Sequence, residues 1–149
     1  MSVVRPFRRR SLPLGGDGAL HLGGPMKTIL IVEDNEKNMK LARDILRAKG
    51  YAVLEAVNGL DGVNLALEHR PDLVLMDIQL PDINGIQAFE RIRGNPATAK
   101  LPVVAFTASV TVNDRSRIGE AGFDGFLSKP INLKEFLETI RRTLEGAAS

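Results

Sequence analysis

The sequence contains no cysteine and only two histidines among its 149 residues. The absence of cysteine excludes disulfide bonds, thiolate metal sites and cysteine nucleophiles. It is compatible with a reducing cytoplasm, where we expect the protein to reside. His21 lies in a segment rich in glycine and proline, and His69 lies just before Pro71 at the end of a predicted helix. Neither histidine has a partner pattern, so a histidine-based metal site is not expected.

Long apolar runs are also missing. No run approaches the roughly 18 residues that a membrane span requires, so we expect no membrane-spanning segment. With 44% hydrophobic and 26% charged residues, the composition is typical of a soluble globular protein. The chain is long enough to form one domain with a substantial core.

Positive charge is concentrated in residues 1–25. This segment holds four arginines against one aspartate, a net charge of +3, whereas the other 16 basic and 17 acidic residues give the body a net charge of −1. The body therefore lacks the basic surface of a nucleic-acid-binding domain. The charged residues of the segment are Arg5, Arg8, Arg9, Arg10 and Asp17.

Residues 1–25 also contain three prolines and five glycines, without a helical or strand period. We predict a disordered extension, because such a composition buries too little apolar surface to fold. No compact apolar segment follows its charges, so it does not match a secretory signal. Its arginines are suited to contact nucleic acid or an anionic membrane. A solvated tail, or a start site assigned upstream of a true start at Met26, is the simpler interpretation.

From Lys27 onward, short apolar runs alternate with helical patterns. The run Ile29–Val32 is continuously apolar and rich in β-branched residues, as is typical of a strand buried on both faces. Asn35 can cap a following helix, which Gly50 ends. The same alternation occurs five times in all. The predicted strands are Ile29–Val32, Ala52–Ala56, Leu73–Met76, Val103–Phe106 and Phe126–Leu127, and the helices that follow them start near Asn35, Asn58, Ile86, Asn113 and Asn132.

This alternation predicts an α/β fold for residues 26–149, as one domain. Strands that alternate with helices form a parallel sheet with right-handed crossovers, so five helices cover both faces of a five-stranded sheet in a three-layer sandwich. In a parallel sheet the carboxyl ends of all strands lie at one edge. Ligands of open α/β sheets bind at that edge.

Charged and polar residues follow four of the predicted strands. Glu33 and Asp34 follow the first strand, Asp77 the third, Thr107 the fourth and Lys129 the fifth. Each residue alone has an ordinary structural explanation, such as a helix cap for Asp34 or a solvated position for Lys129. Their joint placement at one edge is harder to explain in that way. We therefore expect a pocket with three carboxylates, a hydroxyl and an ammonium.

The three carboxylates favour a bound Mg²⁺ ion. Close carboxylates repel one another and raise at least one pKa unless a cation balances them. All the expected ligands are oxygens, which suit Mg²⁺ better than zinc. With the cation bound, Asp77 stays ionised and can attack phosphorus as a nucleophile. Lys129 and Thr107 are then suited to contact the oxygens of the transferring phosphoryl group.

Four stretches of the sequence resemble the motifs of the receiver domain of two-component response regulators. They are Ile29–Asn35, Leu75–Gly85, Phe106–Ala108 and Lys129–Pro130, and the resemblance covers residues 27–145. It implies a flavodoxin-like fold with strand order 2-1-3-4-5.

The resemblance also implies roles at the acidic site. Asp77 is the expected phosphoacceptor, which receives a phosphoryl group from a histidine kinase or a histidine phosphotransfer protein with Mg²⁺ as cofactor. Asp34 is expected to bind the metal directly and Glu33 to assist through water. The backbone carbonyl of Gln79 is the further expected metal ligand.

Other residues acquire roles from the same resemblance. Thr107 and Lys129 are expected to contact the phosphoryl group, and a cis Lys129–Pro130 bond would direct the lysine inward. Phe126 occupies the position of the switch aromatic, where tyrosine is frequent, and is expected to turn inward when Thr107 moves. The side chains of Gln79 and Ser109 are expected to influence the dephosphorylation rate. Beyond catalysing its own phosphorylation and dephosphorylation, the protein is not expected to be an enzyme.

The run Leu80–Ile86 resembles DivK-type single-domain receivers and the receivers of hybrid kinases. Because the sequence ends at Ser149, just after the last predicted helix, we expect a single-domain response regulator without a DNA-binding domain. Its output would then be protein contact through the fourth helix, fifth strand and fifth helix. Relay of the phosphoryl group to another histidine is the alternative.

Two functions from other classes fit the sequence less well. A Mg²⁺-dependent phosphatase with an aspartyl intermediate needs a second aspartate two residues after the nucleophile, where this chain has Gln79. A flavodoxin-like binding module needs a loop rich in glycine or hydroxyl residues after the first strand. Here Glu33 and Asp34 would repel phosphate in the absence of a metal.

Overall fold

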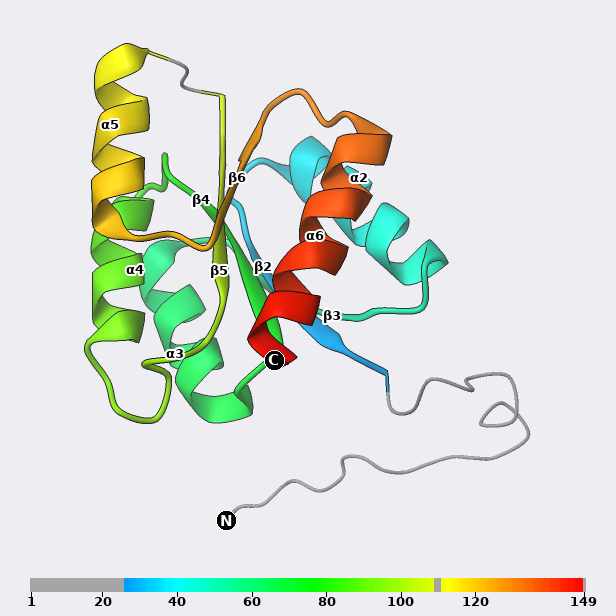
Figure 1. The fold of residues 1–149 in the computed structure, drawn as a ribbon, viewed down its shortest axis with the longest axis horizontal. Coiled ribbons are helices and arrows are strands. Elements are labelled where there is room, and N and C mark those ends of the chain that lie inside the picture. The colour runs from blue at the N-terminus through cyan, green and yellow to red at the C-terminus, as the bar shows by residue number, and fades with distance from the viewer. Residues whose placement is uncertain (1–25, 109–110, 149) are drawn as a thin grey trace.

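The computed structural model describes residues 26–108 and 111–148, within which five strands and five helices alternate (Figure 1). The predicted N-terminal extension, residues 1–25, lies outside the described residues, as does Ser109. In the described part of the chain, no helix has both the length and the apolar content to cross a bilayer. The elements are β2 (Thr28–Val32), α2 (Glu36–Ala48), β3 (Ala52–Ala56), α3 (Gly59–His69), β4 (Leu73–Asp77), α4 (Gly85–Arg93), β5 (Val103–Thr107), α5 (Val112–Ala121), β6 (Gly125–Ser128) and α6 (Leu133–Ala148).

The five strands form one parallel sheet in the order β3-β2-β4-β5-β6. Counted along the chain, this order is 2-1-3-4-5, so the predicted fold class is confirmed. Helices α2 and α6 cover one face of the sheet, and α3 and α4 cover the other, with α5 beside α4 (Figure 1). The three inner strands, β2, β4 and β5, therefore run between two layers of helices.

Both faces of the central strands are buried because their residues are apolar without interruption. Ile29 and Ile31 pack into one core cluster and Leu30 and Val32 into the other, since successive side chains of a strand point to opposite faces. All four have no exposed surface. Such two-sided burial fixes the register, because a slip of one residue would exchange the two cores.

The helices begin close to the carboxyl ends of the strands, at caps that the sequence supplies. The side chains of Asn35, Asn58 and Asn84 each accept a hydrogen bond from a backbone N–H in the first turn of their helix. Helix α5 extends the predicted Asn113–Glu120 segment by one residue at each end, because Thr111 acts as its cap. The loops from β2 to α2 and from β3 to α3 are consequently short.

The loop between β4 and α4 turns back tightly beneath Asp77. The backbone N–H of Gly85 donates to the carbonyl of Ile78 at 2.8 Å. A Cβ atom at position 85 would overlap the carbonyl oxygen of Asp77 and lie 2.7 Å from the Cα of Ile78. Only glycine fits this close approach of two backbone segments.

We expect the substitution Gly85→Ala to lower the free energy of unfolding by about 2 kcal/mol or more, because the new methyl group forces the backbone apart. Urea unfolding of the purified variant measures this loss. Gly119→Ala is the matched control, since a Cβ atom there meets nothing within 4 Å. In a helix this control should be neutral or stabilising by up to about 1 kcal/mol. Equal effects of the two substitutions would contradict the role assigned to Gly85.

Candidate functional site

The carboxyl edge of the sheet brings the predicted site residues together. Glu33 directly follows β2, and Asp77 is the last residue of β4, the neighbouring strand. Thr107 ends β5, which pairs with β4 on its other side, and Lys129 directly follows β6. Residues separated by up to about 100 positions in sequence thus share one edge because the strands are parallel and in register.

A single ammonium group lies between two buried carboxylates. The Nζ atom of Lys129 is 2.7 Å from Oε1 of Glu33 and 3.0 Å from Oδ2 of Asp77. Glu33 has no exposed surface and Asp77 is 3% exposed. The ring of Phe106 lies beneath the ammonium, with its centroid 4.9 Å from Nζ. Lys129 is therefore held as the counter-charge of both carboxylates.

Backbone groups of the following loops hold the other carboxylate oxygens. The N–H of Asn35 donates to Oε2 of Glu33 at 3.0 Å, and the N–H of Gln79 donates to Oδ1 of Asp77 at 3.1 Å. Oε1 of Glu33 is buried and has no well-aligned hydrogen bond from any described residue. Its compensation comes from the charge of Lys129 alone.

Burial raises the pKa of Glu33 to about 7, despite the opposing effects of the Lys129 ammonium and the Asn35 N–H. The adjacent carboxylate of Asp77 raises the pKa of Glu33 further. One ammonium is thus insufficient to stabilise the carboxylates that surround it, and the edge of the sheet carries excess negative charge.

The carboxylates are arranged to accept a cation. One ligand oxygen from each of Glu33, Asp34 and Asp77 lies within 4.8 Å of the others. Asp34 is exposed, so the cluster is open to solvent on one side. Oxygen ligands, excess negative charge and access to water match the requirements of Mg²⁺, which keeps several of its waters when a protein binds it. The residues present therefore fit this metal.

The remaining residues predicted from the sequence and described by the structure are Gln79, Pro130 and Phe126. The side chain of Gln79 is exposed beside Asp77, and the Lys129–Pro130 peptide bond is cis. Phe126 lies on the edge strand β6, opposite Ala105 and outside the acidic cluster. The guanidinium carbon of Arg115 is 5.2 Å from the centroid of the Phe126 ring.

Asp82 is a residue that we did not identify from the sequence. Its carboxylate accepts hydrogen bonds from the N–H groups of Gly59 at 2.7 Å and Leu60 at 2.8 Å. These contacts join the β4–α4 loop to the first residues of α3, across 23 and 22 positions of sequence. From the sequence alone, Asp82 is recognisable only as a turn residue, because no local pattern predicts hydrogen bonds to residues so far away in the chain.

Comparison with known proteins places these observations in a family. Residues 29–141 match the sequence model of the response regulator receiver domain. The polar-differentiation response regulator DivK of Brucella anthropi is 45% identical over 121 residues, which cover 81% of this chain and 98% of DivK. The DivK protein of Brucella ovis is 43% identical over the same shares of the two chains.

Solved structures agree with the sequence relatives. The CheY-like receiver domain protein of Methanospirillum hungatei JF-1 superimposes with a TM-score of 0.77 at 27% identity, over 83% of this chain and 97% of that chain. The receiver domain of the sensor histidine kinase PA1611 from Pseudomonas aeruginosa PAO1 does so with a TM-score of 0.76 at 32% identity, over 80% and 98% of the two chains. In that structure a magnesium ion is coordinated in the active-site cleft. The predicted resemblance, including its DivK-type character, is confirmed.

The raised pKa of Glu33 predicts a pH-dependent loss of stability in metal-free buffer. Its pKa of about 7 in the folded state lies above the ordinary value of 4.5. Between these values the folded state retains a proton that the unfolded state has lost, so stability falls as the pH rises through this window. Glu33→Gln lacks this titration. We therefore expect its free energy of unfolding, relative to that of wild type, to rise by on the order of 2–3 kcal/mol between about pH 5 and about pH 8.

Urea unfolding at several pH values with a chelator present measures this difference. Glu138→Gln is the control, because Glu138 is exposed on α6 and should follow the wild-type profile. Parallel profiles for wild type and Glu33→Gln would show that Glu33 does not titrate in this window.

Proposed function

Because the chain belongs to the response regulator receiver domain family, we propose that it accepts a phosphoryl group on Asp77 from a histidine kinase or a histidine phosphotransfer protein. The observation that carries this proposal is the meeting of three acidic side chains and one ammonium at the carboxyl edge of the sheet. The phosphoryl group then alters the surface that the protein presents to a partner. The protein acts as a switch.

Glu33, Asp34 and Asp77 are the residues that would hold Mg²⁺, with the backbone carbonyl of Gln79 as a further ligand. When bound, Mg²⁺ supplies positive charge that balances the carboxylates and draws electron density from the transferring phosphoryl group. The magnesium ion in the PA1611 receiver domain supports this assignment.

Asp77 is positioned to act as a nucleophile. The Gln79 N–H and the Lys129 ammonium each bind one of its two oxygens, which fixes the orientation of the carboxylate. In the transfer, a carboxylate oxygen of Asp77 forms a bond to phosphorus while the bond from phosphorus to the donor imidazole nitrogen breaks. Correct orientation before the reaction lowers the entropic part of the barrier.

Lys129 and Thr107 would stabilise the transferred group. Lys129 already contacts Asp77, so its ammonium needs little movement to reach a phosphoryl oxygen. Thr107 is fully buried at the end of the adjacent strand. The exposed side chain of Gln79 borders the site and would control the access of hydrolytic water. Ser109 is assigned the same influence on the phosphoryl lifetime from the sequence resemblance alone.

We place the response to phosphorylation on α5, β6 and α6. Movement of Thr107 toward the phosphoryl group would pass to Phe126 on the neighbouring strand and from Phe126 to Arg115 of α5. In α5 only Ile118 is buried, so this helix has less packing to lose on moving than the others. A shift of this helix would change the surface that it forms with β6 and α6.

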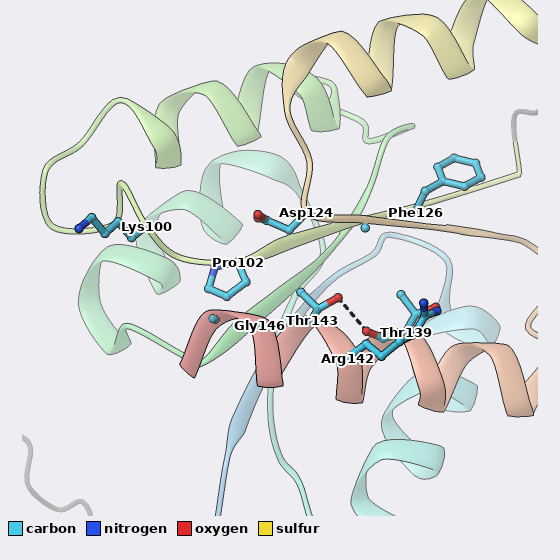
Figure 2. Close-up of a pocket in the computed structure, with 10 residues that line it drawn as sticks. Lys100, Pro102, Asp124, Phe126, Thr139, Arg142, Thr143 and Gly146 are labelled. Carbon is cyan, nitrogen blue, oxygen red and sulfur yellow. Dashed lines mark hydrogen bonds between the residues drawn. The ribbon is translucent and has the colours of Figure 1, made fainter. Parts of the chain in front are cut away.

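This surface contains a groove of about 430 Å³ between β6 and α6 (Figure 2). Figure 2 shows the Phe126 ring at its edge, directed away from α6. Thr139 and Arg142 of α6 and Lys100 of the α4–β5 loop also line the groove. Within the described part of the chain, neither Lys100 nor Arg142 forms an ion pair. These two cations fit a downstream protein that presents acidic side chains, and the acidic residue Asp124, which also lines the groove, is paired with Arg93.

Incubation with acetyl phosphate and Mg²⁺, followed by intact mass measurement, tests the proposed function. We expect wild type to gain the mass of one phosphoryl group and Asp77→Asn to gain none. Asp34→Asn should be labelled at least about tenfold more slowly than wild type. Loss of a residue that only supports a metal ligand already lowers metal affinity or activity by about that factor. Asp44→Asn is the control, because Asp44 is exposed on α2 and pairs with Lys40.

Unmodified wild-type protein, or equal labelling of Asp77→Asn, would overturn the proposal. Rapid turnover of many phosphomonoesters would favour a phosphatase instead. Transfer of the phosphoryl group from labelled protein to a second histidine protein would identify an intermediate of a phosphorelay.

A further inference from the structure

The carboxylate of Asp82 connects the β4–α4 loop to the start of α3. Its two oxygens accept one hydrogen bond each, from the N–H of Gly59 at 2.7 Å and the N–H of Leu60 at 2.8 Å. Both donors belong to the first turn of α3, where N–H groups have no partner within the helix. The carboxylate also lies at the positive end of the helix dipole. Asp82 therefore binds α3 by charge and by two hydrogen bonds.

The backbones of the two loops pack directly against each other at this point. A Cβ atom on Gly59 would lie 2.6 Å from Cγ1 of Ile83 and 3.1 Å from its carbonyl oxygen. Glycine at position 59 thus allows the β4–α4 loop to approach α3 closely. Desolvation acts to raise the pKa of the Asp82 carboxylate, but the backbone N–H groups of Leu60, Gly59, Ile83 and Asp82 itself together lower the pKa. The lowered pKa agrees with a carboxylate held as an anion.

The same loop carries the backbone that borders Asp77. Its first residues are held by the bond from the Gln79 N–H to Asp77 and its last by the bond from the Gly85 N–H to Ile78. Asp82 lies between these two anchors and holds the exposed middle of the loop. Leu80 and Ile83 on either side of it pack against the core, and Asp82 supplies the polar contacts between the middle of the loop and α3.

We propose that Asp82 is a positioning residue, which holds the β4–α4 loop on α3 so that the backbone of Gln79 is in place for the cation at Asp77. This inference rests on the proposed function, since it concerns the same Mg²⁺ site. A loop that is already ordered loses less conformational entropy when its carbonyl binds a metal. Asp82 thus increases Mg²⁺ affinity without contacting the ion.

Titration of ¹⁵N-labelled protein with MgCl₂, followed by amide NMR shifts, measures the dissociation constant for Mg²⁺. We expect Asp82→Ala to weaken Mg²⁺ binding by about tenfold, as is typical for the loss of an outer partner of a metal site. In wild type, the amide signals of Gly59 and Leu60 should shift with the same midpoint as the signal of Gln79. These two amides donate the hydrogen bonds to Asp82, so their signals report directly on the contact between the β4–α4 loop and α3.

Asn58→Ala is the matched control. The Asn58 side chain also caps α3, by accepting from the N–H of Asp61 at 2.8 Å, and it donates to the Asp61 carboxylate, so these bonds lie at the start of α3 and not in the β4–α4 loop. It should destabilise the start of α3 while leaving Mg²⁺ affinity within about twofold of wild type. A loss equal to that of Asp82→Ala would show that helix capping alone is responsible, and would overturn the proposal.

Asp82→Asn separates hydrogen bonding from long-range charge. It removes the charge but keeps a carbonyl oxygen that can accept one of the two bonds, so we expect an affinity between wild type and Asp82→Ala. The titrations are made at about 0.15 M salt, where distant charges are largely screened. Equal weakening by both substitutions would assign the effect to charge and would overturn the proposal.

Thermal unfolding establishes whether each variant is folded. If Asp82→Ala does not fold, the proposal is tested by comparing the Mg²⁺ affinity of Asp82→Asn with that of Asn58→Ala, together with the wild-type amide shifts. Affinity within about twofold of wild type in Asp82→Ala, or Gly59 and Leu60 signals that do not respond to Mg²⁺, would overturn the inference. Wild-type protein that binds no Mg²⁺ would instead contradict the proposed function itself.

Discussion

Two carboxylates buried beside one ammonium are the constraint on which this protein depends. Glu33 and Asp77 lie at the ends of neighbouring central strands, and Lys129 contacts both. Burial raises the pKa of Glu33 in spite of Lys129, and the neighbouring Asp77 carboxylate raises it further. With Asp34 nearby, the three carboxylates are arranged to accept a cation, and Asp77 is the residue that we propose as the phosphoacceptor.

The rest of the fold keeps the carboxylates of Glu33 and Asp77 close together. The central strands are buried on both faces, so the edge that they form cannot shift to relieve the repulsion between carboxylates. In α5, by contrast, only Ile118 is buried. The β4–α4 loop is tied beneath Asp77 by Gly85 and to α3 by Asp82. A rigid edge with few movable parts is suited to convert a local change of charge into a change of surface.

The fold and most of the acidic site could be predicted because both follow from short-range patterns. Apolar runs identify strands, asparagines identify helix starts, and a parallel sheet then gathers the strand ends at one edge. Asp82 was not identified, since its partners lie 22 and 23 positions away and each of the three residues is ordinary in its own context. The contact of Arg115 with Phe126 was not predicted either, because it depends on where α5 lies relative to the edge strand.

The sequence by itself determined which residues meet at the edge of the sheet, because alternating strands and helices form a parallel sheet whose strands all end at one edge. The order of the strands was implied by the resemblance to receiver domains. The sequence also determined the kind of chemistry, since carboxylates, a hydroxyl and an ammonium were present at the strand ends. Only the tertiary structure decided how charge is shared among them. Distances of 2.7 and 3.0 Å from Lys129 to Glu33 and Asp77, and full burial of Glu33, depend on packing between elements far apart in the chain. Electrostatic energies vary steeply with distance and burial, and neither quantity is a property of local sequence.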